Sequence, residues 1–317
     1  MKNILVTGGA GAIGSRLVEK LSQSKNKIIV LDNLSSGFVE NVIKSDNVQF
    51  VQGDIEFEDV LKTVFLNKID TVFHLAANFA NQNSVDFPEK DLLVNGLGTL
   101  KLLEYSIENK VRKFIYSSSS CVYGQKDEPL SEEMTDYSLD TPYAITKLLG
   151  ERYVTYFNDH YGLSTVILRY FNSYGPAEYP GKYRNVIPNF FYKAMKGEAL
   201  VITGTGQETR DFNYIDDTVR GTLEASGSQK AVGKIFNIGS GRETKIIDIA
   251  NIVNSITKNK SEIKFAEKRK WDSITSRVAS IEKAQKLIDY SARVKLEEGL
   301  KKTYEWLNKV DFNKCAF

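Results

Sequence analysis

The sequence predicts a doubly wound α/β fold, in which helices cover both faces of a parallel sheet. In the first half of the chain, short apolar strands alternate with helix-length stretches, an order typical of parallel sheets. A glycine-rich turn joins the first strand to the first helix. The 317 residues are 42% hydrophobic and 26% charged, which suits one large domain or two fused domains.

The individual elements follow from local patterns. Residues 13–24 show the 3.6-residue periodicity of an amphipathic helix. Short apolar runs predict strands at 2–7, 27–32, 48–52, 71–76, 113–117 and 164–170. The alternation stops after Asn172, because Gly, Pro and Tyr cluster in 173–185. We therefore expect a first domain over 1–171 and a smaller α/β domain over 172–317, with about 211–240 packing back on the first.

Charge and cysteine content exclude several classes of protein. Lys and Arg number 42 against 40 Asp and Glu, so the net charge of +2 gives no global attraction to nucleic acid or anionic membranes. Cys121 and Cys315 are too few and too far apart for a disulfide framework or a zinc cage. No apolar run approaches the ~18 residues of a membrane helix, and the chain enters a strand at once. These features predict a cytoplasmic protein without a metal, nucleic-acid or membrane partner.

The turn TGGAGAIG (7–14) is the first motif with a chemical use. Its glycines let the backbone approach a pyrophosphate, and the following helix start offers unpaired N–H groups and the positive end of a dipole. The second strand ends about 20 residues later in Asp32, which can accept from both ribose hydroxyls and would repel a 2′-phosphate. Asp54, in GDI (53–55), is expected at the adenine. The pattern predicts NAD rather than NADP.

Tyr143 and Lys147, in YAITK (143–147), form the second motif. The stretch begins near Thr141 with a helical pattern, so both side chains share one helix face with Cβ atoms ~5–6 Å apart. A free tyrosine has a pKa of ~10, and a neighbouring ammonium together with an oxidised nicotinamide would favour the phenolate. Lowering this pKa by ~3 units needs roughly 4 kcal/mol. The spacing is common on surface helices, but its place in a nucleotide-binding half favours a catalytic pair.

Residues 117–124 read SSSSCVYG, directly after the apolar run KFIY. The end of a buried strand thus carries four hydroxyls and a thiol, and no carboxylate. Ser117 and Ser118 can satisfy backbone groups or contact a cofactor. The motif therefore offers hydroxyl groups, and no carboxylate, as candidate catalytic groups.

Together these motifs resemble the extended short-chain dehydrogenase/reductases of the nucleotide-sugar epimerase and dehydratase family, over essentially the whole chain. The segments that carry the resemblance are TGGAGAIG, LDNLSSG (31–37), GDI, HLAA (74–77), VNGLGT (94–99), SSSSCVYG, YAITK, LRYFNSYGP (168–176), NVIP (185–188), GTGQETRDFNYIDD (204–217) and FNIGSG (236–241). The resemblance implies a Rossmann-type sheet with a smaller C-terminal α/β domain for a nucleotide-diphosphate sugar.

The resemblance also implies the ligand contacts. Those to NAD are Gly8, Gly11, Ala12, Ile13, Asp32, Asn33, Ser36, Gly37, Asp54, Ile55, Leu75, Ala76, Ala77, Asn95, Ser117, Tyr143 and Lys147. Those to the nucleotide sugar are Ser119, Asn172, Asn185, Arg210 and Arg269. Guanidinium groups match phosphate oxygens. The second phosphate arginine stays open between Arg269 and Arg277, because 269–280 is one residue longer than the family pattern.

The same resemblance narrows the reaction. The family's 4,6-dehydratases carry Asp-Glu where Ser120 and Cys121 stand, and its uronic-acid decarboxylases carry Glu at the position of Cys121. What remains is reversible oxidation at sugar C4, with Ser119, Tyr143 and Lys147 as catalytic residues. We expect a 4-epimerase. The alternatives are a 4-dehydrogenase or another C4-modifying enzyme of this family, and a non-catalytic NAD-sensing binding protein.

The family resemblance further implies a homodimer. Its members commonly pair two long helices per subunit into a four-helix interface. The candidates here are residues 86–109 and 143–157, although Leu148, Leu149, Tyr153 and Tyr156 could instead face the core.

Overall fold

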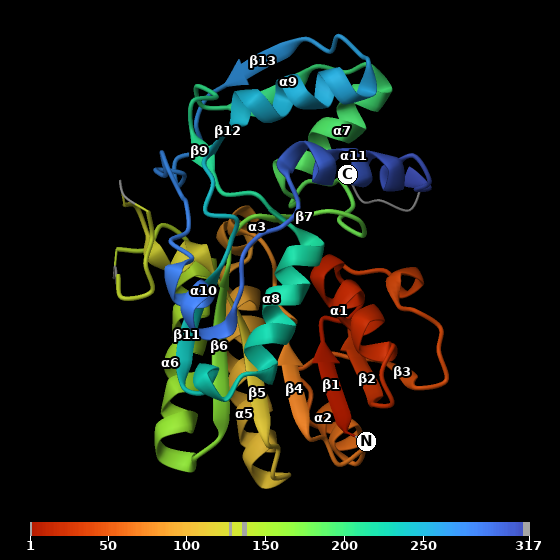
Figure 1. Cartoon of the computed structure of the whole chain (residues 1–317), viewed down its shortest axis with the longest axis vertical. Helices are drawn as coiled ribbons and strands as arrows, with labels where there is room; N and C mark the ends of the chain where they lie inside the picture. Colours follow the sequence, from red (N-terminus) through yellow and green to blue (C-terminus); the bar gives the residue numbers. More distant parts are fainter. Residues whose placement is uncertain (1, 127–128, 135–137, 313–317) are drawn as a thin grey trace.

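A computed structural model of the chain describes residues 2–126, 129–134 and 138–312, so Cys315 lies outside the described part. Its centre is a seven-stranded parallel sheet in the order β11-β6-β5-β4-β1-β2-β3 (Figure 1). The strands are β1 (Asn3–Thr7), β2 (Lys27–Asp32), β3 (Val48–Gln52), β4 (Thr71–His74), β5 (Lys113–Ser119), β6 (Ser164–Tyr170) and β11 (Lys234–Ile238). The predicted doubly wound fold is confirmed.

Helices cover both faces of this sheet because its strands are apolar on both sides. Ile4 and Val6 belong to one buried cluster and Leu5 to the other, as alternation along a strand requires. The helices of the first cluster are α1 (Ala12–Ser22), α8 (Ile215–Gly227) and α10 (Glu282–Ile288). Those of the second are α2 (Glu58–Phe65), α5 (Thr99–Glu108) and α6 (Pro142–Tyr161). The two clusters fix the sheet that carries the site.

The helix that bears the YAITK motif has clear boundary signals. The Thr141 hydroxyl accepts a hydrogen bond from the Ala144 N–H at 3.3 Å, and Pro142 occupies the first turn. Gly162 ends α6 in the left-handed region, with φ of 69°. The helix therefore begins where the sequence predicts, and it presents Tyr143 in its first turn.

Two elements differ from the sequence-based expectation. β5 continues to Ser119 because Ser117 and Ser119 lie opposite Leu168 and Tyr170 of β6. The expected helix over 86–109 is present from Pro88 onward but is not uniformly α-helical. α4 (Pro88–Asp91), a π-helical segment η2 (Leu92–Gly98) and α5 follow one another without a break, and α3 (Asn81–Asp86) precedes them. Pro88 lacks an N–H group and stands in the first turn of α4, where that group is not needed.

A smaller layer of helices lies above the carboxyl ends of the central strands (Figure 1). Its elements are α7 (Val186–Lys196), β8 (Leu200–Thr203), α9 (Ile246–Thr257), β13 (Ile263–Ala266) and α11 (Leu296–Leu307). Short strand pairs connect the layers: β7 (Ser173–Tyr174) with β10 (Asn213–Tyr214), and β9 (Thr209–Arg210) with β12 (Thr244–Lys245). The smaller layer has its own apolar cluster. The domain boundary after residue 171 stays a prediction.

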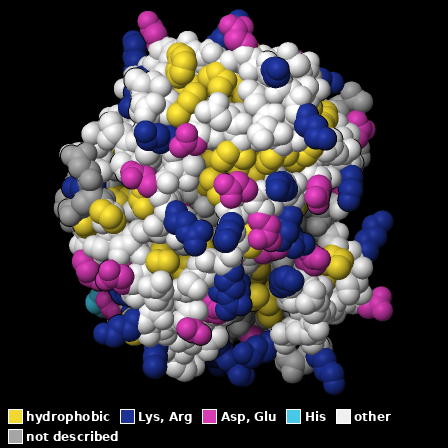
Figure 2. Space-filling view, turned by 45° about the horizontal axis from the view of Figure 1, so that its top comes forward, with side chains coloured by type: hydrophobic (Ala, Val, Ile, Leu, Met, Phe, Trp, Pro, Cys, Tyr) yellow, Lys and Arg dark blue, Asp and Glu magenta, His cyan; other side chains and the backbone are white. Residues whose placement is uncertain are grey.

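The surface carries both signs of charge. Figure 2 shows Lys and Arg interspersed with Asp and Glu over one face, in keeping with a net charge of +2. Within the described residues, no helix is both long enough and apolar enough to span a bilayer.

Candidate active site

A cavity of about 370 Å³ opens at the carboxyl edge of the central sheet. Its walls come from the segments that follow β1 to β5, from the first turns of α6, and from residues 172–185 and 271–277 of the smaller layer. In open α/β sheets, ligands bind at this edge where the strand order reverses, which here is between β1 and β4. The fold therefore places the cavity at the expected ligand site.

The glycine turn forms the first wall and leaves room for a dinucleotide. Gly8 has φ of +70°, and a Cβ atom there would lie 2.6 Å from the Ala76 backbone nitrogen. A Cβ on Gly14 would lie 2.1 Å from the Gly8 carbonyl oxygen. Gly11 precedes α1 without a side-chain cap, so the first N–H groups of α1 can bind a pyrophosphate. These residues fit NAD.

Asp32 forms the neighbouring wall at the end of β2. It is 8% exposed, and its carboxylate accepts hydrogen bonds from the N–H groups of Ala10 at 2.9 Å and Leu34 at 2.8 Å. Burial raises the pKa of Asp32, while the two N–H donors oppose that rise. Asn33 donates to Asp54 at 2.6 Å. Asp32, Asn33 and Asp54 all line the cavity. This wall suits a ribose and an adenine.

Tyr143 and Lys147 both reach the cavity from α6, as their spacing predicts. The Lys147 ammonium lies 5.8 Å from the Tyr143 ring centroid and donates to the Ser117 carbonyl at 2.8 Å. Burial lowers the pKa of Lys147 to about 8, although the Asp91 and Glu151 carboxylates oppose the shift. Lys147 is thus mostly protonated at neutral pH.

The expected lowering of the Tyr143 pKa does not occur in the protein by itself. Burial raises the pKa of Tyr143, and the charges of Cys121 and Asp91 raise it further. The Ser119 hydroxyl acts in the opposite direction as a hydrogen-bond partner. The Lys147 ammonium, 5.8 Å from the ring centroid, does not offset the effect of burial. A phenolate at Tyr143 needs further positive charge beside it.

The serines at the end of β5 have different hydrogen-bond partners, because successive side chains point to opposite faces of a strand. Ser119 lines the cavity and accepts from the Cys121 N–H at 3.2 Å. The Ser118 hydroxyl instead donates to Glu151 at 2.5 Å. Glu151 also pairs with the buried guanidinium of Arg169 at 2.7 Å. Sequence analysis missed this pair, because Glu151 and Arg169 come from separate elements and meet only beneath the site.

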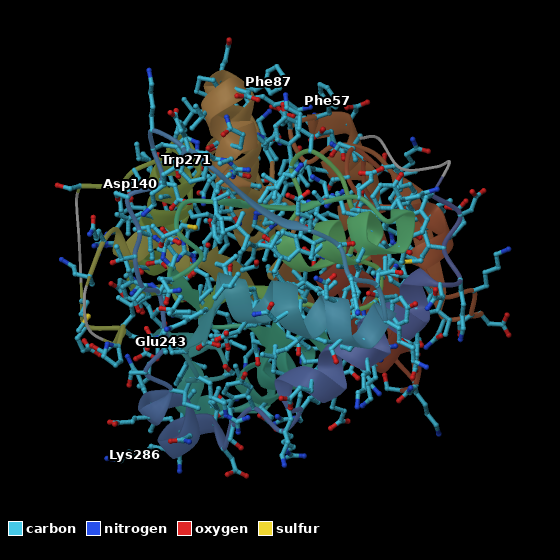
Figure 3. All side chains as sticks on the ribbon, turned by 90° about the horizontal axis from the view of Figure 1, so that it is seen from above. Phe57, Phe87, Asp140, Glu243, Trp271 and Lys286 are labelled. Atoms are coloured by element: carbon cyan, nitrogen blue, oxygen red, sulfur yellow. The ribbon has the colours of Figure 1, made fainter. Side chains whose placement is uncertain are left out.

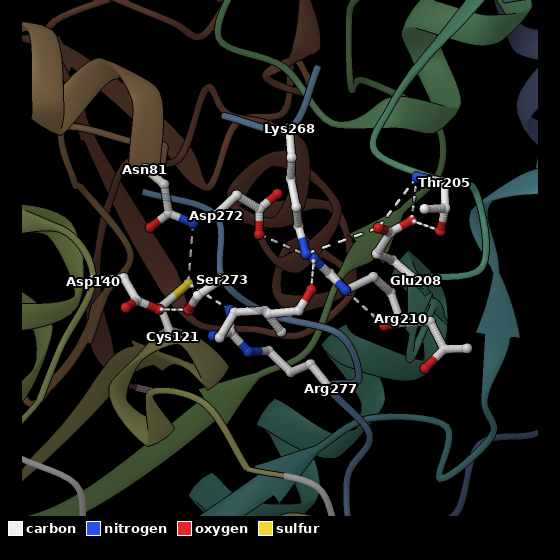
Figure 4. A network of polar contacts seen from close by, with 12 residues as sticks. Asn81, Cys121, Asp140, Thr205, Glu208, Arg210, Lys268, Asp272, Ser273 and Arg277 are labelled. Atoms are coloured by element: carbon white, nitrogen blue, oxygen red, sulfur yellow. Dashed lines mark hydrogen bonds and ion pairs between the residues drawn. The ribbon is translucent and has the colours of Figure 1, made fainter. Parts of the chain in front are cut away.

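Two arginines converge on the far wall of the cavity (Figure 4). Arg210 lies 3.4 Å from Asp272 and donates to the Thr209 carbonyl at 2.8 Å. Burial lowers the pKa of Arg210, and the charge of Arg277 contributes to the same shift. Arg277 is 8% exposed, and its Nε has no hydrogen-bond partner among the described residues. Two guanidinium groups on one wall, with Asp272 as the carboxylate beside Arg210, suit the phosphates of a nucleotide sugar.

Arg277 and a second cavity residue surround Cys121. The Arg277 Nη1 and the Asn81 amide nitrogen each lie 3.5 Å from the Cys121 sulfur (Figure 4). The Asn81 carbonyl in turn accepts from Thr141 at 2.9 Å, which ties the segment after β4 to the start of α6. Asn81 lies between the motif segments 74–77 and 94–99, so sequence reasoning gave it no role.

Most of the predicted ligand residues lie on the cavity wall. They are Gly8, Gly11, Ala12, Ile13, Asp32, Asn33, Ser36, Asp54, Ile55, Leu75, Ala76, Ala77, Ser117, Ser119, Tyr143, Lys147, Asn172, Asn185 and Arg210. Their individual roles stay predictions.

Three predicted residues lie away from the wall. Gly37 packs against Ala10, where a Cβ would come within 2.6 Å of backbone. Asn95 is 1% exposed, and its carbonyl accepts from the Asn78 N–H at 2.8 Å, so it supports a wall segment instead of lining it. The Arg269 guanidinium lies over the Trp271 ring at 5.6 Å, whereas Arg277 lines the cavity. The structure therefore favours Arg277 over Arg269 for a phosphate.

Contacts between the two layers lie beside the cavity, since Trp271 and Asp140 both line it. Trp271 donates to the Gln82 carbonyl at 2.9 Å, and Ser273 donates to Asp140 at 3.0 Å. Trp271 and Asp140 lie on the same side of the molecule when it is seen from above (Figure 3). Among the described residues, no group of three or more His, Cys, Asp or Glu could hold a metal ion.

Comparison with known proteins agrees with this site. Residues 4–239 match the model of the NAD dependent epimerase/dehydratase family. An epimerase structure from Methanothermobacter thermautotrophicus superposes with a TM-score of 0.97 at 48% identity, covering 100% of this chain and 96% of that one. A UDP-glucose 4-epimerase of Thermotoga maritima, solved with UDP-glucose, has a TM-score of 0.92 at 38% identity, covering 97% and 99%.

Other relatives differ in chemistry. A UDP-N-acetyl-α-D-glucosaminuronate decarboxylase of Bacillus cytotoxicus is 31% identical over 98% of this chain and 99% of its own length. The fold and the cavity define an NAD-dependent enzyme of the α/β class. The chain belongs to the NAD-dependent epimerase/dehydratase family, whose members act on nucleotide sugars and include epimerases, decarboxylases and dehydratases.

Proposed function

We propose that the protein is a nucleotide-sugar 4-epimerase, which oxidises the sugar at C4 and reduces it again from the opposite face. The observation that carries the proposal is the lining at the end of β5, where Ser119 and Cys121 reach the cavity and no carboxylate does. Elimination or decarboxylation needs an additional acid or base at this place. Reversible redox at C4 needs only a hydroxyl, a phenolate and the cofactor.

Tyr143 is the base in this mechanism. It takes the proton of the 4-hydroxyl, directly or through Ser119, and returns it when the 4-keto sugar is reduced. Lys147, with a pKa of about 8, keeps a positive charge beside the phenol at neutral pH. Bound NAD supplies the hydride acceptor and donor, as well as the further positive charge that the buried Tyr143 needs.

The remaining cavity walls bind the dinucleotide and the diphosphate of the nucleotide sugar. Gly8, Gly11 and Asp32 bind the dinucleotide, while Arg210 and Arg277 bind the diphosphate of the nucleotide sugar. Anchoring the diphosphate leaves the sugar ring free to turn, which presents either face of C4 to one fixed hydride position. The 48% identical epimerase and the UDP-glucose complex of the Thermotoga maritima enzyme support this assignment.

The reaction is tested with a panel of UDP-sugars and NAD-loaded protein, followed by NMR. We expect interconversion of 4-epimers without added NAD, and retention of deuterium placed at C4, because the same hydride leaves and returns. A dehydrogenase would instead trap the deuterium on the cofactor and release a 4-keto sugar. Deuterium on the cofactor without any epimer would defeat the epimerase assignment.

We further propose a homodimer. Exposed apolar side chains lie on η2 and on α6, which pack against each other, namely Leu92, Leu93, Leu97, Ile145 and Tyr156. Leu92 is 51% exposed and Ile145 54% exposed, and such a group rarely remains in water on a monomer. A second copy of the chain is the partner that the family resemblance suggests.

A further inference from the structure

Glu178 is a buried carboxyl group in the wall of the cavity that the proposed mechanism does not use. The residue is 6% exposed and lines the cavity in the segment between β7 and α7. Its Oε1 accepts from the Asn185 amide at 2.6 Å. Its Oε2 is buried and has no hydrogen-bond partner among the described residues. A buried carboxyl oxygen without a partner is costly, which points to a ligand as the missing partner.

The surroundings of Glu178 make its neutral form available near neutral pH. Burial raises the pKa of Glu178 to about 7, against the opposing effects of the Asn185 hydrogen bonds and the Arg184 charge. Arg184 is the charged side chain whose field reaches this carboxyl group within the described chain. Arg210 and Arg277 line the same cavity, and their positive charge suits the diphosphate of the proposed substrate. A carboxylate in that wall would repel the diphosphate, whereas a carboxylic acid can donate to it or to a sugar oxygen.

We propose that Glu178 positions the nucleotide sugar as a neutral acid, donating the proton on Oε2 to an acceptor oxygen of the substrate, so that substrate binding is linked to protonation of this one group. The inference rests on the proposed function, since it needs an anionic nucleotide sugar in the cavity. Binding by the protonated form alone makes affinity proportional to the protonated fraction. Affinity therefore falls as pH rises through the pKa of Glu178.

The test is calorimetric titration of UDP-glucose into NAD-loaded protein at pH 6, 7, 8 and 9, or of UDP-N-acetylglucosamine or UDP-glucuronic acid where UDP-glucose is not bound. We expect the affinity of the unaltered protein to fall by roughly tenfold from pH 6 to 8, and by roughly a further tenfold at pH 9. Binding at pH 8 should take up about one proton, seen as a dependence of the enthalpy on the buffer.

The decisive variant is Glu178→Gln, whose amide donates at every pH. Its affinity should match that of the unaltered protein at pH 6 and stay constant, so that at pH 9 the variant binds roughly a hundredfold more tightly. The melting temperature and NAD affinity of the variant report on its fold. A merely structural role would weaken binding at all pH values instead.

Glu208→Gln is the matched control, a carboxylate close in sequence to Arg210 but outside the cavity lining. The pKa of Glu208 is lowered, with backbone and side-chain donors outweighing burial, so its charge is constant over this range. The Glu208→Gln substitution should therefore change the affinity for the UDP-sugar by the same factor at every pH. Affinity that is independent of pH in the unaltered protein, or a pH slope that survives in Glu178→Gln, overturns the role of Glu178. Failure of all three UDP-sugars to bind at any pH contradicts the proposed function itself.

Discussion

The two sides of the cavity are built in different ways. The dinucleotide side comes from short contiguous motifs, because Gly8, Gly11 and Asp32 lie at the ends of neighbouring strands β1 and β2. The side proposed for the nucleotide sugar joins Arg210, Arg277 and Glu178 from separate segments of the smaller layer. The first side relies on backbone groups and Asp32, whereas the second relies on ionisable side chains, two of which, Arg277 and Glu178, each keep one buried polar atom without a hydrogen-bond partner among the described residues. The difference predicts geometric, local effects for the first and electrostatic, pH-dependent effects for the second.

The largest effect is expected where the two sides meet. Tyr143→Phe removes one hydroxyl from a residue that is 7% exposed, so the fold and NAD affinity should persist. Turnover should fall by about a thousandfold, because general base catalysis contributes 10²–10⁴-fold. Stopped-flow and steady-state kinetics measure this. A variant with more than a tenth of the original turnover would show that Tyr143 is not the base.

On the substrate side, Arg277→Ala should weaken UDP-sugar binding by about 10- to 100-fold, since hydrogen bonds to charged groups contribute about 1.5–3 kcal/mol. NAD affinity should hardly change. Arg269→Ala is the matched control, because that guanidinium lies over Trp271 outside the cavity, and its effect should stay within about twofold. If calorimetry shows a larger loss of UDP-sugar affinity for Arg269→Ala than for Arg277→Ala, Arg269 is the phosphate ligand instead.

On the dinucleotide side, Asp32→Ala should raise the affinity for NADP relative to NAD by about tenfold, by removing the ribose acceptor and the repulsion of a phosphate. The N–H groups of Ala10 and Leu34 lose their acceptor, so stability should fall by about 1–3 kcal/mol. Calorimetry and denaturant unfolding measure the two effects. Equal binding of NAD and NADP by the unaltered protein would remove the basis of this prediction.

A pH profile separates the two sides further. The pKa of Lys147 is lowered to about 8, so its positive charge is present below pH 8 and lost as pH rises. Turnover should therefore decline above pH 8, by about tenfold at pH 9, as the charge beside Tyr143 disappears. Lys147→Arg keeps its charge and should flatten this decline in kcat. A decline in kcat that persists above pH 8 in Lys147→Arg would contradict the role assigned to Lys147. Protonation of Glu178, in contrast, should change substrate affinity and leave kcat unchanged.

The smallest effect on activity is expected at the exposed apolar side chains of η2 and α6, which lie outside the cavity. Leu97 is 39% exposed, and Leu97→Glu should dissociate the proposed dimer while turnover stays within about twofold. Lys62→Glu, a charge change at an exposed residue of α2, serves as the control and should leave assembly unchanged. Light scattering at micromolar concentration measures both. A monomeric mass for the unaltered protein would end the dimer hypothesis.

Contiguous patterns were enough to predict six of the seven strands of the sheet, the glycine turn, Asp32 and the Tyr143–Lys147 pair, whereas β11 was not predicted as a strand. Periodicity and glycine spacing act over a few residues, and the parallel order of strands then brings their carboxyl ends to one edge. Boundaries were less predictable. The extension of β5 to Ser119 depends on pairing with β6, and the π-helical segment η2 lies where its helix packs against α6.

Only the tertiary structure decided which charges face one another. It placed Arg277 on the cavity wall and Arg269 over Trp271, although both belong to one basic segment. It also buried Glu178 beside Asn185 with one oxygen unpaired. Burial and neighbouring charge set a pKa, and both depend on elements far apart in the chain. The motifs therefore specify what the site contains, while the packing of the two layers specifies which of its groups are charged when substrate binds.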